Sequence, residues 1–91
     1  MTIGETTVKN KTGLHARPAA TFATMAAKFK SKISIKNLDT DSKEVNAKSV
    51  VSVLTLGMSK GTKARITADG EDADEAVSML TSLIDGGFGE I

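Results

Sequence analysis

Residues 12–20 read Thr12-Gly13-Leu14-His15-Ala16-Arg17-Pro18-Ala19-Ala20, and His15 is the single histidine of the chain. In this stretch a strand-like segment gives way to a helical one. A neutral imidazole offers a nucleophilic nitrogen, and the open N–H groups and positive dipole end of a following helix favour an anion. Arg17 adds a guanidinium whose planar fork fits phosphoryl oxygens. Together these groups indicate a side chain that carries a phosphoryl group.

The segments on either side of this stretch predict the first strand and the first helix. β-Branched residues within Ile3–Asn10 favour a strand with Thr6 and Val8 on one face. After the stretch, apolar residues at i, i+3, i+4 and i+7 spacing predict a helix from Ala16 to Phe29. The buried face of that helix comprises Ala19, Phe22, Ala23 and Ala26.

The middle of the chain predicts a hairpin followed by a short helix. Residues 32–38 alternate between polar and apolar side chains, which is the pattern of a half-buried strand. Short polar residues at Asp39–Ser42 indicate a loop, and Lys43–Ala47 is the returning strand. Ser49 has the chemistry of a helix N-cap, so a short helix is expected over Val50–Leu56, ended by Gly57.

The last third of the chain predicts one more strand and one more helix. Thr62–Asp69 alternates again, and an apolar stripe from Ala73 to Ile84 marks a helix ended by Gly86-Gly87. Acidic residues favour the dipole-positive start of that helix, namely Glu71, Asp72, Asp74 and Glu75. This order of elements predicts an α+β open-faced sandwich. A four-stranded antiparallel sheet is covered on one face by three helices, in a single domain over residues 1–91.

Composition excludes several classes of function. The 91 residues carry 12 basic and 11 acidic side chains, and the three aromatic residues are all Phe, which argues against nucleic-acid binding. Cysteine is absent, and a single histidine disfavours a metal site. No apolar run approaches the roughly 20 residues of a membrane span, and the amino end lacks a signal-peptide pattern. We therefore expect a soluble cytoplasmic protein without metal or cofactor.

The stretch Gly13–Pro18 resembles the active-site signature of the histidine-containing phosphocarrier (HPr) family of the bacterial phosphotransferase system. That signature is Gly, an aliphatic residue, His, a small residue, Arg and then usually Pro, and every position matches. Later stretches resemble further segments of the family in order: Val45–Val51 with its regulatory serine, Leu56-Gly57, Ser59–Gly61 and Asp69–Ala76. The resemblance covers essentially the whole chain and implies the same open-faced sandwich.

The resemblance implies a phosphocarrier in the phosphoenolpyruvate-dependent sugar phosphotransferase system. His15 would accept a phosphoryl group on Nδ1 from the general phosphotransferase enzyme and pass it to sugar-specific permease components. Arg17 would stabilise the phosphate through its side chain, and Ala16 through its backbone N–H. Such a protein is a stoichiometric, monomeric carrier and not an enzyme with its own turnover.

The resemblance also implies a regulatory serine and a docking surface. Ser49 would be phosphorylated by an HPr kinase/phosphorylase, and an apolar patch of Val50, Val51 and Leu54 would meet partner proteins, among them a transcription regulator. The residues alone leave plainer alternatives open, because Ser49 can be a simple N-cap and the valines a short core helix. Two other functions also stay open: the carrier of the nitrogen-related branch, and a regulatory HPr-like module that acts by binding a partner.

Overall fold

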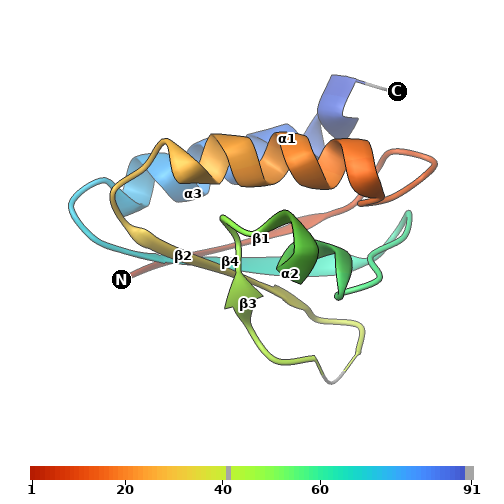
Figure 1. Cartoon of the computed structure of the whole chain (residues 1–91), viewed down its shortest axis with the longest axis horizontal. Coiled ribbons are helices and arrows are strands. Elements are labelled where there is room, and N and C mark those ends of the chain that lie inside the picture. The colour runs from red at the N-terminus through yellow and green to blue at the C-terminus, as the bar shows by residue number, and fades with distance from the viewer. Residues whose placement is uncertain (41, 90–91) are drawn as a thin grey trace.

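The computed structural model describes residues 1–40 and 42–89, so Asp41 of the predicted loop and the last two residues lie outside it. Within that part of the chain, four strands form one antiparallel sheet in the order β1-β4-β2-β3 (Figure 1). The strands are β1 (Thr2–Thr7), β2 (Lys32–Asn37), β3 (Val45–Asn46) and β4 (Lys63–Asp69). The helices α1 (Ala16–Ala27), α2 (Val50–Leu54) and α3 (Ala73–Asp85) cover one face, and a 3₁₀ turn, η1 (Gly87–Gly89), follows α3. This is the predicted open-faced α+β sandwich.

Alternation along the strands decides which side chains enter the core. In β4, Ala64, Ile66 and Ala68 are fully buried, while the residues between them are more exposed. Strand β2 buries Ile33 and Ile35 in the same way. The helices pack their apolar stripes on this face, and the removal of apolar surface from water is the main driving force for the fold. None of the helices in the described residues is long and apolar enough to cross a membrane.

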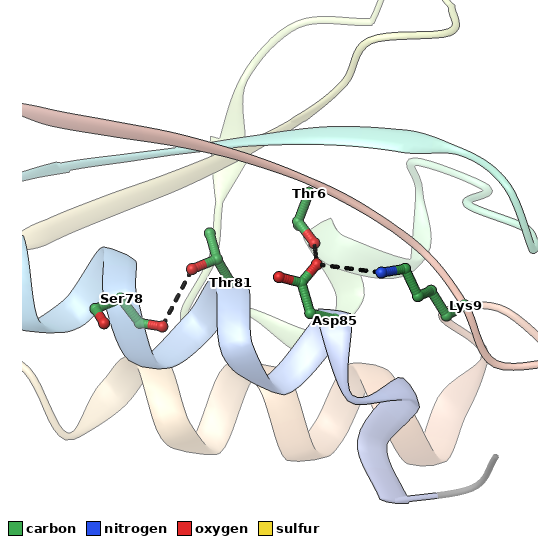
Figure 2. Close-up of polar contacts among 5 residues, drawn as sticks. All are labelled: Thr6, Lys9, Ser78, Thr81 and Asp85. Carbon is green, nitrogen blue, oxygen red and sulfur yellow. Dashed lines mark hydrogen bonds and ion pairs between the residues drawn. The ribbon is translucent and has the colours of Figure 1, made fainter.

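Helix α3 packs closely over β1 because residue 4 is a glycine. A Cβ atom at Gly4 would lie 2.5 Å from Cγ1 of Val77. Polar contacts join the same two elements near the end of α3, where Asp85 accepts a hydrogen bond from Thr6 (Figure 2). The Nζ of Lys9 lies 3.9 Å from the same carboxylate oxygen. Since Lys9 follows β1, this exposed ion pair links α3 to the segment that leads from β1 to α1.

The strands are shorter than predicted. The regular β1–β4 pairing ends at Thr7 and Lys63, so β1 stops short of the predicted Asn10 and β4 starts one residue later than the predicted Thr62. Beyond that pair, Val8 donates its N–H to the Thr62 carbonyl and accepts the N–H of Gly61, outside the regular ladder. Strand β3 keeps only Val45–Asn46 of the predicted Lys43–Ala47, because its register with β2 covers only the pairs Ile35–Val45 and Ser34–Asn46.

Two helices also end earlier than predicted. Helix α1 stops at Ala27 and α2 at Leu54, two residues before the predicted ends. Phe29 and Leu56 each donate the backbone N–H to the carbonyl three residues back, which closes the final turn as a tighter 3₁₀ turn. Both side chains still belong to the core, and each is 8% exposed.

Asp72 does more than favour the start of α3. Its carboxylate makes no cap to α3 but accepts hydrogen bonds from the hydroxyl of Ser31 and from the N–H groups of Lys30 (2.8 Å) and Ser31 (3.0 Å). These hydrogen bonds hold the pKa of Asp72 below its ordinary value, and the largest effect comes from the Ser31 hydroxyl, followed by the Lys30 N–H. Asp72 therefore ties the turn after α1 to the start of α3.

Candidate functional site

His15 occupies the N-cap position of α1 and is exposed to solvent. Its backbone is extended, with φ −78° and ψ −169°, and its carbonyl accepts the N–H of Ala19 at 2.9 Å. Its imidazole makes no capping hydrogen bond to the helix. The backbone thus fixes His15 at the helix start while the ring faces solvent.

The loop before His15 is held in place by a glycine and by the segment after α2. Gly13 has φ +67°, a left-handed conformation that favours glycine. A Cβ atom there would lie 2.4 Å from the carbonyl oxygen of Met58. The next residue, Leu14, is buried and donates its N–H to that same carbonyl at 3.0 Å. The position of His15 therefore depends on the segment that follows α2.

Asn10 shapes the same loop, a role that the sequence pattern did not reveal. Asn10 is fully buried, and its Nδ2 donates to the carbonyl oxygen of Gly13 at 2.7 Å. The N–H of Gly13 donates in turn to the carbonyl of Asn10 at 3.1 Å. These two bonds close a turn over residues 10–13. The signal that could have found it is an asparagine a few residues ahead of a glycine in a polar stretch, which is typical of turns.

The first turn of α1 leaves two backbone N–H groups beside His15. The N–H of Ala19 makes the first intrahelical hydrogen bond, and the groups ahead of it have no acceptor within the helix. Pro18 contributes no N–H, so the open groups belong to Ala16 and Arg17. They lie at the positive end of the helix dipole, where an anion is favoured.

Arg17 places a positive charge at the same helix end. Its side chain is exposed, and within residues 1–40 and 42–89 it forms no ion pair. The following residue, Pro18, is buried and packs the turn against the core. The guanidinium of Arg17 is thus available to an anion bound at the start of α1.

Ser49 caps α2, as the sequence predicts. Its Oγ accepts the N–H of Ser52 at 3.2 Å, and its carbonyl accepts the N–H of Val53 at 3.0 Å. This hydrogen bonding satisfies two of the backbone groups at the start of a helix that is only five residues long.

The apolar residues of α2 divide between the core and the surface. Val53 is fully buried and Val50 packs half-buried against the core, whereas Val51 is 72% exposed and Leu54 is 40% exposed. Helix α2 packs against α1, and the segment after α2 binds the loop that carries His15. Val51 and Leu54 therefore form an exposed apolar surface on a helix that is directly connected to the site.

Fold and site together define a small α+β domain that presents one histidine at the start of a helix. Residues 4–85 match the family model described as the PTS HPr component phosphorylation site. The chain belongs to the HPr family of the phosphotransferase system.

Relatives of two sizes share this similarity. The chain is 43% identical over 86 residues to the phosphocarrier protein HPr of Xylella fastidiosa, a match that covers 94% of this chain and 93% of the relative. It is 42% identical over 88 residues to the multiphosphoryl transfer protein of Haemophilus influenzae, covering 97% of this chain and 18% of that protein. The chain thus spans about a fifth of the length of the multiphosphoryl transfer proteins that it matches.

A solved structure has the same fold. The crystal structure of HPr-C-His from Thermoanaerobacter tengcongensis is similar with a TM-score of 0.91 at 45% sequence identity. The match covers 100% of this chain and 99% of that chain.

Proposed function

We propose that this chain is a phosphocarrier of the phosphoenolpyruvate-dependent sugar phosphotransferase system and acts as a single domain over residues 1–91. His15 accepts a phosphoryl group from the general phosphotransferase enzyme and passes it to sugar-specific components. The observation that carries this proposal is the exposed His15 at the start of α1, beside two open N–H groups and the Arg17 guanidinium. The names of the relatives, phosphocarrier protein and multiphosphoryl transfer protein, support it.

The reaction needs positioning and charge stabilisation more than covalent help from the protein. An imidazole nitrogen of His15, Nδ1 by the family resemblance, attacks the phosphorus of a donor phosphohistidine in line. A new N–P bond forms as the bond from phosphorus to the donor nitrogen breaks, and the donor nitrogen keeps that electron pair. The N–H groups of Ala16 and Arg17 and the Arg17 guanidinium receive the phosphoryl oxygens.

In this proposal the protein is a stoichiometric carrier without turnover of its own, and it acts as a monomer in the cytoplasm. A carrier must release its phosphoryl group as readily as it accepts it. One exposed histidine, one arginine and the donors of a helix start bind phosphate loosely enough for the next acceptor to remove it. Contacts with each partner are small and transient for the same reason.

We assign the docking of partner proteins to α2. Val51 and Leu54 expose most of the apolar area there, and the half-buried Val50 exposes less. Ser49 starts this helix and is the proposed regulatory residue, modified by an HPr kinase/phosphorylase. A phosphate at Ser49 places negative charge next to the docking surface. It would therefore impede transfer to His15 and favour a different partner, a transcription regulator.

The test is phosphoryl transfer from labelled phosphoenolpyruvate through the purified general phosphotransferase enzyme, run in parallel with its nitrogen-branch counterpart. We expect fast labelling by the sugar-branch enzyme, onward transfer to a sugar-specific component, and slower labelling by the nitrogen-branch enzyme at equal concentration. Faster labelling by the nitrogen-branch enzyme would show that the chain serves that branch. If neither enzyme labels the chain, a regulatory module that acts by binding alone is the better description.

A further inference from the structure

A recess of about 440 Å³ lies where β2 begins and where the chain leaves β3 for α2. Its lining residues are Lys30, Ser31, Lys32, Ile33, Ser34, Asn46 and Lys48. The segment that begins this lining follows the C-terminal end of α1, whereas His15 caps the N-terminal end (Figure 1). Because a helix of 12 residues is about 18 Å long, the recess is separate from the His15 site.

The charged side chains that line this recess are all lysines. Three lining residues, Lys30, Lys32 and Lys48, are lysines, and none of the lining residues carries a carboxylate. Within the described part of the chain, none of these lysines forms an ion pair. Lys48 is half-buried, and its Nζ donates to the carbonyl of Phe29 at 2.7 Å, which fixes this ammonium at the rim. Because three ammonium groups around one recess repel each other, an anion between them lowers the electrostatic free energy.

Three carboxylates lie near the recess, but none of them is among its lining residues. Glu44 accepts a hydrogen bond from Ser34 Oγ at 2.9 Å. The Asp72 carboxylate accepts hydrogen bonds from the backbone N–H groups of Lys30 and Ser31. Asp69 lies opposite Lys32 in the β2–β4 register but makes no ion pair with it. The positive charge thus belongs to the lining itself, because the three carboxylates lie outside it.

Hydrogen bonds hold the backbone on both sides of the recess. On one side, the N–H groups of Lys30 and Ser31 are bound by the Asp72 carboxylate. On the other side, the side-chain oxygen of Asn46 accepts the N–H of Lys48 at 3.0 Å. The lysines thus project from two fixed segments, which lowers the entropic cost of binding a ligand between them.

We propose that this recess binds a small organic anion that carries at least two phosphate or carboxylate groups. Two groups match the two sides of the recess, with Lys30 and Lys32 on the β2 side and Lys48 on the α2 side. The volume falls in the range of about 300–1,000 Å³ that is typical of small-molecule sites. A recess of this volume favours a small molecule over an extended acidic segment of a protein.

The test is a titration of the unphosphorylated, isotope-labelled protein with pyrophosphate and, separately, with citrate, followed by NMR of the backbone amides. The ionic strength is kept constant at about 0.1 M so that general screening does not change. We expect saturable shifts of the amides of residues 31–34 and 46–48 with at least one of the two anions. The anion that binds more tightly identifies the favoured group, phosphate or carboxylate.

Two lysines of β2, the exposed Lys32 and the half-buried Lys36, provide the variant and its control. Lys32→Gln removes a lining charge and should weaken the affinity about tenfold or more, the usual effect of one lost charge-assisted contact. Lys36→Gln removes the same charge from the same strand and face, outside the lining, and should change the affinity little. Equal loss in both variants, or shifts that rise linearly with concentration, would overturn the site. So would shifts confined to Ala16 and Arg17, or binding of a polyglutamate peptide when neither small anion binds.

Discussion

The imidazole of His15 reaches solvent because neighbouring residues fix the backbone around it. Gly13 supplies a left-handed turn, and the buried Asn10 closes that turn through two hydrogen bonds. Pro18 packs into the core directly after the exposed Arg17. Gly13 and Pro18 thus set the backbone conformation, while the side chains of His15 and Arg17 are exposed to solvent. This division lets a change at one residue separate chemistry from stability.

Replacing Arg17 tests its role in transfer. Arg17→Ala should slow phosphoryl transfer by roughly tenfold to a hundredfold, because a charge-assisted contact contributes about 1.5–3 kcal/mol. The melting temperature should stay close to that of the wild type, since the side chain is exposed. Rapid-quench measurement of transfer from the phosphorylated donor gives the rate. Arg17→Lys keeps the charge but loses the planar fork, so its transfer rate should lie between those of the wild type and Arg17→Ala. Unchanged kinetics in Arg17→Ala would make this residue an ordinary surface charge.

Replacing Gly13 tests how the loop before His15 is held. Gly13→Ala should destabilise the protein, because the backbone is left-handed and the new Cβ would collide with the Met58 carbonyl. Gly57→Ala is the matched control: its φ is +58°, but nothing lies within 4 Å of the new Cβ. Gly57→Ala should cost about 1–2 kcal/mol for the left-handed conformation alone, and Gly13→Ala should cost clearly more. Urea unfolding measures both. Equal losses would show that the close approach to Met58 has no energetic importance.

At the scale of the elements, short pieces of structure are held by side chains from elsewhere in the chain. Helix α2, with five residues, is far below the length at which an isolated helix is stable. It persists because Ser49 caps it and Val53 is fully buried. The turn after α1 is held in a comparable way by Asp72, at the start of α3.

Substitutions at Ser49 separate its capping role from its proposed regulatory role. Ser49→Ala should lower the free energy of unfolding by about 0.5–2 kcal/mol through the lost cap, yet it should transfer phosphate almost normally. Ser49→Asp can still cap the helix but adds a negative charge beside Val51 and Leu54, so it should accept phosphate more slowly. Denaturant unfolding and transfer kinetics on the same preparations provide the comparison. If Ser49→Asp transfers at the wild-type rate and an HPr kinase adds no acid-stable phosphate to Ser49, the serine is structural.

The hydrogen bonds to Asp72 predict how stability responds to acid. The pKa of Asp72 in the folded protein lies below its ordinary value of 3.8, so its stabilising effect is complete above that value. The effect is lost as the pH falls through the folded pKa. The difference in unfolding free energy between the wild type and Asp72→Asn should therefore be constant near neutral pH and should shrink below about pH 4. Asp69→Asn removes a nearby charge and controls for net charge. A difference that does not vary with pH would contradict this account.

At the scale of the whole molecule, local pattern predicts the architecture, and long-range contacts set the details. Alternation in β4 and the stripe of α3 are local, so the sandwich could be predicted from the sequence. The end of β1 at Thr7 depends on where β4 begins, about 56 residues later in the chain. The contact of Asp72 with Lys30 likewise joins distant segments, and periodicity carries no information about such partners. The candidate site follows the same rule: His15 and Arg17 stand in one local motif, whereas Met58 does not.

The most direct test of the central claim compares the wild type with His15→Ala in the labelling reaction with the general phosphotransferase enzyme and labelled phosphoenolpyruvate. Since the His15 ring makes no capping bond to α1, the variant should keep its fold, which circular dichroism and the melting temperature check. The wild type should take up label that is labile in acid and stable in base, at one equivalent per chain, and His15→Ala should take up none. Acid-labile label on the folded His15→Ala variant, or a wild type that stays unlabelled by an active donor, would contradict the account.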